Sequence, residues 1–269
     1  MRRGLAVVLT TTLALCTAAA TLGDLPMSVF VVHCEPTNAD EAMWRGLVSL
    51  VSLADQYSVP LSIDFTPQWA EMLLEDAEKL AALDAWLAAG HEIGCHHHAY
   101  WSTMSRAASW DGYTSTPLEE ILPQDRPRYR GTMEEFMMLL AALPGERRSG
   151  CLGSSEERDE GDWPCEIVYS TVGNAVEDAV SQPAARSIGG CEVLEVGHAL
   201  IAGAERGALR ELYGKTDSEM IFGVVGHVYN YRDFPAVFEQ WFAYLASLDD
   251  EGARRGTVSD VLDGWGDEE

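Results

Sequence analysis

Positive charge is scarce in this chain of 269 residues, and lysine is almost missing from it. Lysine and arginine together number 18, against 43 aspartates and glutamates, so the formal net charge is −25. Lys79 and Lys215 are the only lysines, and arginines do not gather into a basic stripe. Because a phosphate backbone is bound by a basic surface, the composition argues against a nucleic acid as partner.

Apolar runs long enough to cross a bilayer are also missing. Residues 1–3 carry two arginines, an apolar run follows over 5–14, and small residues stand at 18–20. This is the pattern of a secretory signal peptide, and its apolar run is short for a membrane span. We therefore expect residues 1–20 to be a leader and the mature protein to be secreted or periplasmic, with no membrane span. Cys16 matches a lipid-anchoring sequence only loosely, so a lipid anchor is the less favoured alternative.

No linker rich in proline, serine or glycine and no internal repeat divides the remaining chain, which predicts a single domain over residues 25–269. Five cysteines follow the leader: Cys34, Cys95, Cys151, Cys165 and Cys191. An exported chain can form disulfides, and Cys151 with Cys165 is a candidate pair across a short loop. An odd number leaves at least one thiol outside any intramolecular pair.

The hydrophobic pattern alternates between strand and helix periods. The expected strands cover residues 28–33, 59–65, 91–95, 167–171, 192–196 and 220–225. The first expected helix follows a cap at 37–40, and the second covers 67–87. The third begins at the capping box of Thr132 and Glu135, and the last covers 233–248. Such alternation implies an α/β protein with a parallel sheet, either a (β/α) barrel or a doubly wound sheet. In both, chemistry gathers at the carboxyl ends of the strands.

Residues 90–98 read Gly-His-Glu-Ile-Gly-Cys-His-His-His, so three of the seven histidines stand together where an expected strand ends. Imidazole is the commonest protein ligand for transition metals and titrates near neutral pH. The cluster therefore indicates a metal site, a proton-transfer site or both. The alternative is a solvated polar loop.

His33, Glu35 and His227 stand at the ends of other expected strands, which places them beside the triple histidine. A two-residue period sends His33 and Glu35 to one side of their strand and Cys34 to the other. A carboxylate with two imidazoles is the ligand set of many hydrolytic divalent-metal sites. His198 also follows an expected strand, but a lone histidine is more often structural, and we do not include it.

Together these segments resemble the NodB-homology polysaccharide deacetylases, from about Val29 to Val261. The strongest part is 90–94 followed by His96, and the family's later Leu-His motif falls on Gly226-His227. The letters of 159–163 also fit the family's Asp-x-x-Asp-Trp motif. The resemblance implies a distorted (β/α) barrel that uses a zinc-type metal to remove N- or O-acetyl groups from polysaccharides.

Three motif positions depart from the family's pattern. Its catalytic-base aspartate falls on Cys34, its metal aspartate on Glu35 and its second metal histidine on Tyr100. Its Arg-x-Pro motif is not evident near Arg147-Arg148. One interpretation is a rebuilt metal site, and the other is a degenerate site on a surviving fold.

We favour the rebuilt site, in which Glu35 reaches with its extra methylene and His98 or His97 replaces the missing histidine beside His96. The expected ligands of a divalent metal, zinc by the resemblance, are Glu35, His96, His98 and His33. His227 is the candidate acid for the leaving group, and Asp111 could serve as the base. Trp110 and Tyr113, in the loop after the histidines, would suit stacking against sugar rings.

These residues predict a metal-dependent hydrolase that removes acetyl groups from an extracellular polysaccharide or glycan. The alternatives are a catalytically degenerate, secreted carbohydrate-binding protein on the same fold and a related amide hydrolase. Nucleophilic serine chemistry lacks support because the chain has no Gly-x-Ser-x-Gly elbow. It also has no phosphate-binding glycine loop and no dinucleotide fingerprint.

Overall fold

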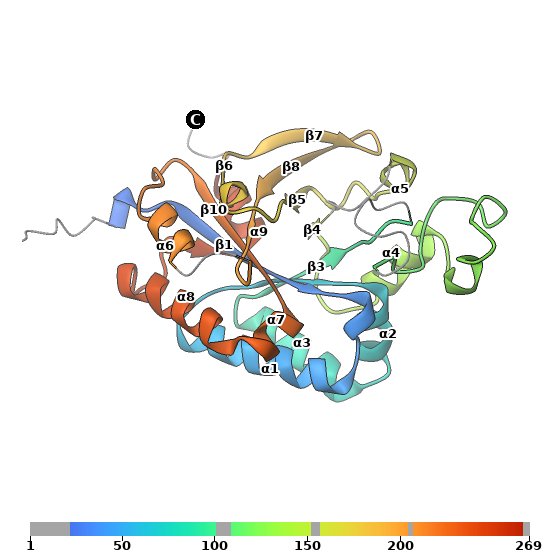
Figure 1. The fold of residues 1–269 in the computed structure, drawn as a ribbon, viewed down its shortest axis with the longest axis horizontal. Helices are drawn as coiled ribbons and strands as arrows, with labels where there is room; N and C mark the ends of the chain where they lie inside the picture. The colour runs from blue at the N-terminus through green and yellow to red at the C-terminus, as the bar shows by residue number, and fades with distance from the viewer. Residues whose placement is uncertain (1–21, 101–108, 152–156, 204–206, 266–269) are drawn as a thin grey trace, which may run out of the picture.

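The computed structural model describes residues 22–100, 109–151, 157–203 and 207–265, and Figure 1 shows their fold. The leader expected over residues 1–20 lies outside the described residues. None of the described helices is both long and apolar enough to cross a membrane.

The body of the sheet is a series of parallel strands in the order β10, β1, β2, β3, β4, β5, β8. In chain order these are β1 (Met27–Cys34), β2 (Ser62–Phe65), β3 (Glu92–His96), β4 (Ser149–Cys151), β5 (Tyr169–Val172), β8 (Cys191–Gly197) and β10 (Ile221–His227). The short strands β6 (Val180–Ser181) and β7 (Ala184–Ile188) pair antiparallel with β10 and β8, while β9 (Ala199–Leu200) and β11 (Arg255–Gly256) pair in parallel with β10 and β1.

The sheet curls until β8 meets β10. The carbonyl oxygen of Gly197, the last residue of β8, lies so close to Gly223 in β10 that a Cβ atom there would collide with it. Strand β9 continues the chain beyond β8 and pairs with β10, Ala199 opposite Val224. Because β8 is also paired with β5, this contact brings the two ends of the parallel series together. The chain is therefore a mixed α/β protein with a curled, half-barrel sheet.

Helices pack around the curled sheet, most of them on its outer face (Figure 1). They are α1 (Glu41–Gln56), α2 (Pro67–Leu74), α3 (Ala77–Ala88), α4 (Met133–Ala141), α5 (Glu157–Gly161), α6 (Ala208–Tyr213), α7 (Val228–Asp233), α8 (Pro235–Leu248) and α9 (Val258–Trp265). Helix α1 starts at Asp40, whose carboxylate accepts hydrogen bonds from the amides of Ala42 and Met43 at 2.8 and 2.9 Å. Helix α4 starts at the capping box that the sequence predicts.

Side chains alternate strictly along β1, and this alternation positions the site. Phe30, Val32 and Cys34 point outward into the main hydrophobic core, where Phe30 packs edge-on against Phe242 of α8 at 4.9 Å between ring centroids. Val29 and Val31 point inward, into a smaller core closed by α9. The same two-residue period places His33 on the inner side, at the carboxyl end of the strand.

Two expected helices have different bounds in the structure. The helix expected over 67–87 breaks into α2 and α3, because Asp76 has extended backbone angles and its carboxylate caps the amides of Glu78 and Lys79. The closing helix expected over 233–248 begins at Pro235, which occupies the first turn of α8.

The candidate disulfide between Cys151 and Cys165 is wrong. Cys165 is bonded to Cys191 instead, at a sequence separation of 26 and with 5.4 Å between their Cα atoms. Cys191 begins β8, and Cys165 lies in the loop that leads into the neighbouring β5. Strand pairing, which the cysteine spacing does not reveal, brings the two together.

Candidate functional site

A cleft of about 980 Å³ opens at the carboxyl ends of the parallel strands. Glu35 and Cys151 line it together with five of the seven histidines, which are His33, His96, His98, His198 and His227. They come from the ends of β1, β3, β4, β8 and β10 and from the residues directly after these strands. The structure thus brings His33, Glu35, His96, His98 and His227 together, as the sequence positions of the strand ends indicate.

Glu35 stands at the centre of this group. One carboxylate oxygen lies 3.4 Å from Nε2 of His96 and 3.1 Å from Nε2 of His227, and the other lies 3.0 Å from Nε2 of His98. The Nε2 atoms of His96 and His98 are 2.7 Å apart. The carboxylate of Glu35 and the imidazoles of His96, His98 and His227 therefore converge on one small volume.

Burial and the neighbouring rings set the charges of these groups. Burial alone would raise the pKa of the Glu35 carboxyl, but hydrogen bonds from His227, His96 and His98 hold that pKa well below its usual range. Burial, and next to it the ring of His98, lowers the pKa of His96 to about 4. Burial also lowers the pKa of His33 well below its usual value. The cleft thus holds an ionised carboxylate at Glu35 and neutral imidazoles at His96 and His33, which are the ligating forms of both groups.

The donor set fits a divalent cation. The ligand atoms of Glu35, His96 and His98 lie within 4.8 Å of one another, and so do those of His33, Glu35 and His227. The Nε2 atoms of His96 and His98 lie 2.7 Å apart, and a hydrogen bond between them uses the lone pair of only one of the two nitrogens. A cation between them and Glu35 would use both lone pairs, and nitrogen with carboxylate oxygen is a usual zinc donor set.

The middle histidine of the triple points away from the cleft. His97 is fully buried, with Nδ1 2.7 Å from Asp111 and Nε2 3.1 Å from Asp159. Burial would lower the pKa of His97, yet the two carboxylates, Asp111 foremost, raise it to about 10. Asp111 also accepts hydrogen bonds from the amides of His98 and Tyr113, at 2.9 Å each. The structure therefore does not place Asp111 with the cleft residues but behind them, where it fixes the backbone of His98.

Trp110 and Tyr113 are buried as well. The indole of Trp110 donates to the carbonyl oxygen of Tyr113 at 2.9 Å and packs on Tyr100. Tyr113 belongs to the main hydrophobic core and is 4% exposed. Neither ring lines the cleft. Among the described residues, Tyr229 lines it instead and stacks on His227 with 4.8 Å between ring centroids.

Two positions where the chain departs from the deacetylase pattern lie outside the cleft. Cys34 points into the main core, and burial raises the pKa of its thiol well above the usual value. Tyr100 is buried, and its hydroxyl donates to Asp125 at 3.0 Å and accepts from the amide of Leu122. Both side chains act here as packing residues.

Two cleft residues and one buried acid beside them were not predicted from the sequence. His198 and Cys151 line the cleft, although one was set aside as structural and the other was considered only for a disulfide. Asp64 lies inside the barrel, 1% exposed, with its carboxylate 3.9 Å from Nε2 of His33, and burial raises its pKa well above the usual value. The signal for Asp64 was an acid at an inward-facing position of an expected strand.

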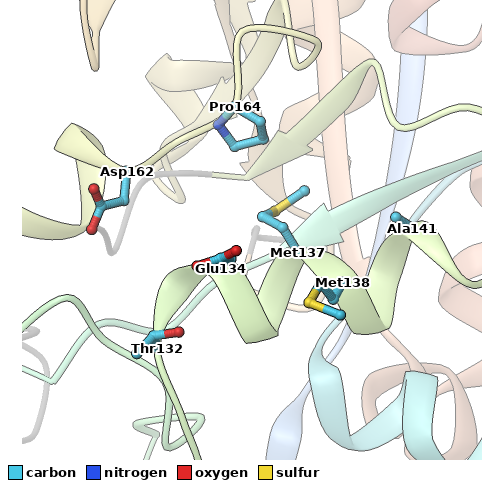
Figure 2. A pocket seen from close by; sticks show the side chains of 7 residues that line it. All are labelled: Thr132, Glu134, Met137, Met138, Ala141, Asp162 and Pro164. Atoms are coloured by element: carbon cyan, nitrogen blue, oxygen red, sulfur yellow. The ribbon is translucent and has the colours of Figure 1, made fainter.

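A second hollow, on the outer face of α4, is of a different kind (Figure 2). Met137, Met138 and Pro164 make much of its lining, and Asp162 stands at its rim. The residues of the Asp-x-x-Asp-Trp match are thus dispersed, because Asp159 bonds His97 and Trp163 lies in the main core. Titratable groups that could act on a substrate gather in the cleft.

No protein-family model and no curated protein sequence matches the chain. Solved structures of similar fold include a protein described as a polysaccharide deacetylase from Mycobacterium smegmatis, at 10% identity and a TM-score of 0.51 over 92% of this chain and 93% of that one. One described in the same way from Pseudomonas aeruginosa has 14% identity and a TM-score of 0.54 over 91% and 92%. Puue allantoinase has 13% identity and a TM-score of 0.55 over 90% and 91%. These similarities confirm the expected fold class, the distorted (β/α) barrel of the NodB-homology type.

Proposed function

We propose that this protein is a metal-dependent hydrolase that removes acetyl groups from a carbohydrate. The observation that carries the proposal is the convergence of Glu35, His96 and His98 at the carboxyl ends of the barrel strands. We call these three residues the Glu35 site. They would hold one divalent cation, zinc by their donor chemistry. When bound, such a cation polarises a carbonyl group and acidifies a water molecule.

His227 is the proton donor in this proposal. Its Nδ1 lies 2.9 Å from Oδ1 of Asn230, an acceptor, so Nδ1 carries a hydrogen and donates. Its Nε2 faces the Glu35 carboxylate at 3.1 Å and donates as well when the ring is protonated. A ring held in this way keeps Nε2 as the atom that releases a proton to the departing amine or alkoxide.

Asp111 holds the site in shape rather than touching the substrate. Its carboxylate joins the ring of His97 to the amide of His98, so it fixes the strand end that carries both His96 and His98. On the substrate side, Tyr229 offers a ring face at the cleft, and Asn38 and Asn174 offer amide groups. These groups suit a sugar ring with its hydroxyls.

A second candidate is hydrolysis of an amide that is not part of a carbohydrate. The similarity to Puue allantoinase favours it, as does Arg232, which brings a guanidinium to the lining of the cleft. We further propose that the chain is exported to the cell exterior or periplasm. The disulfide between Cys165 and Cys191 supports this, because disulfides persist in oxidising compartments.

The test is metal content and acetate release from leader-free protein, compared with His96→Ala and with His91→Gln as a matched control. His91 is buried outside the cleft, where it bonds Asp55 and the amide of Leu61. We expect His96→Ala to lose one equivalent of zinc and all release of acetate from acetylated oligosaccharides, while His91→Gln keeps both. Metal binding without release from any acetylated glycan, but with release of ammonia or a carboxylate from amides, would favour the second candidate. Sugar binding without metal would make the protein a non-catalytic binding protein.

A further inference from the structure

A second group of ligating side chains lies in the same cleft. The ligand atoms of His33, Cys151 and His198 fall within 4.8 Å of one another. All three side chains are more than nine-tenths buried, at 5%, 6% and 1% exposure. None of them belongs to the Glu35 site, although the ring of His33 stacks on that of His96 with 4.0 Å between centroids.

Strand pairing places the three residues opposite one another. Cys151 ends β4 and pairs with Thr171 of β5. The amide of His198, directly after β8, donates to the carbonyl oxygen of Val172 at 2.8 Å. His33 comes from β1, which the curl of the sheet brings across the barrel, so that its ring meets that of His198 at 5.4 Å between centroids. The group is therefore fixed by the backbone of the barrel and not by a loop.

Three of the four ring nitrogens in this group lack hydrogen-bond partners among the described residues. They are both ring nitrogens of His198 and Nε2 of His33. A buried polar atom without a partner costs on the order of 1–3 kcal/mol, and each such atom calls for an explanation. A cation held by Glu35, His96 and His98 would leave the nitrogens of His198 unsatisfied, since His198 is not one of its ligands.

We infer that His33, Cys151 and His198 form a second metal site beside the Glu35 site, here named the Cys151 site. Two imidazoles and a thiolate select zinc or a softer cation over magnesium and calcium, which prefer oxygen donors. Binding releases the thiol proton of Cys151 to solvent, so the thiolate and the cation meet without any change in oxidation state. This goes beyond the proposed hydrolysis, which needs the Glu35 site alone.

The test uses the full folded protein without its leader, stripped of metal and titrated with Co²⁺ alone. Cobalt bound by a thiolate gives a sulfur-to-cobalt charge-transfer band in the near ultraviolet, which nitrogen and oxygen ligands do not give. We expect two equivalents per chain and the thiolate band in the unaltered protein. Cys151→Ser and His198→Ala should each bind one equivalent fewer, and Cys151→Ser should lose the band. Cys95→Ala is the matched control, because Cys95 is buried in the main core, away from the cleft, and should keep both equivalents and the band.

The outcomes separate this inference from the proposed function. One equivalent without a thiolate band, lost in His96→Ala but kept in Cys151→Ser, overturns the Cys151 site and leaves the proposed hydrolase intact. One equivalent with the band, lost in Cys151→Ser but kept in His96→Ala, supports the Cys151 site and refutes the metal role of the Glu35 site. The absence of any binding refutes both. The band in the unaltered protein decides the question even where a variant fails to fold.

Discussion

Replacing His97 with glutamine should destabilise the fold by about 3–5 kcal/mol near neutral pH. The ring of His97 is the cation between the carboxylates of Asp111 and Asp159, and all three side chains are at most 1% exposed. Glutamine keeps roughly the size and one hydrogen bond but removes the charge. Two buried carboxylates then lack a counter-ion, and breaking a buried ion pair from one side typically costs about 3–5 kcal/mol.

The raised pKa of His97 leads to a similar value for the stability that this residue contributes. The carboxylates raise this pKa from 6.5 to about 10, and each pKa unit corresponds to about 1.4 kcal/mol, so the interaction is worth on the order of 5 kcal/mol. Because the folded pKa is above the unfolded one, this stability is fully present below pH 6.5 and is lost as the pH rises through 10. The difference between the two proteins should therefore shrink toward zero across that window.

Urea unfolding of both proteins at several pH values between 6 and 10 would measure this difference. His91→Gln is the control, because burial lowers the pKa of His91, so its contribution is not lost on the alkaline side. A penalty for His97→Gln below about 1 kcal/mol, or one that stays constant from pH 6.5 to 10, would refute the argument that His97 is a buried cation. Because Asp111 also holds the amide of His98, we expect the same variant to bind metal at the Glu35 site about 10–100-fold more weakly, as for other residues that orient ligands.

Three further substitutions test the fold. Cys165→Ser removes the disulfide between two cysteines at a sequence separation of 26. Loop entropy predicts that the free energy of unfolding in urea falls by about 3–4 kcal/mol. A reducing agent should abolish this difference between variant and parent, because it breaks the disulfide of the parent. Gly94→Ala places a Cβ against the Asp64 carboxylate and the Ser149 carbonyl. We expect thermal unfolding to show a loss of about 1–3 kcal/mol in stability, and a smaller loss when Asp64 is also replaced by alanine. Asp40→Ala removes the N-cap of α1 and should cost about 0.5–2 kcal/mol in the same assay, with Asp84→Ala, an exposed position inside α3, close to neutral.

The site residues that could be predicted are those at strand ends. The two-residue period of β1 put His33 and Glu35 on one side and Cys34 on the other, and the structure has this arrangement. The same period applied to the triple histidine would have resolved the choice between His97 and His98, because only His96 and His98 can share the inner side with Glu35. Local alternation is enforced by backbone geometry, and it is readable without knowledge of distant contacts.

Loop residues and long-range partners were not predictable in this way. Asp111, Trp110 and Tyr113 lie in a segment without periodicity, so their sequence closeness to the histidines said nothing about the direction of their side chains. The disulfide failed for a related reason, since Cys165 meets Cys191 only through the pairing of β5 with β8. His198 looked solitary in the sequence because the residues that surround it come from β1 and β4.

The pairing of β1 with β10 has a consequence for how the chain is made. Met27 lies opposite Ile221 and His33 opposite His227. The central strand β1 therefore pairs with a strand that is synthesised almost two hundred residues later. At roughly 5–20 residues per second, ribosomal synthesis separates the two by roughly 10–40 seconds. Throughout that interval the apolar residues of β1 have no finished barrel to enter. The acidic composition of the chain makes unfinished copies repel one another during this interval, which keeps their exposed apolar strands apart until the barrel can close.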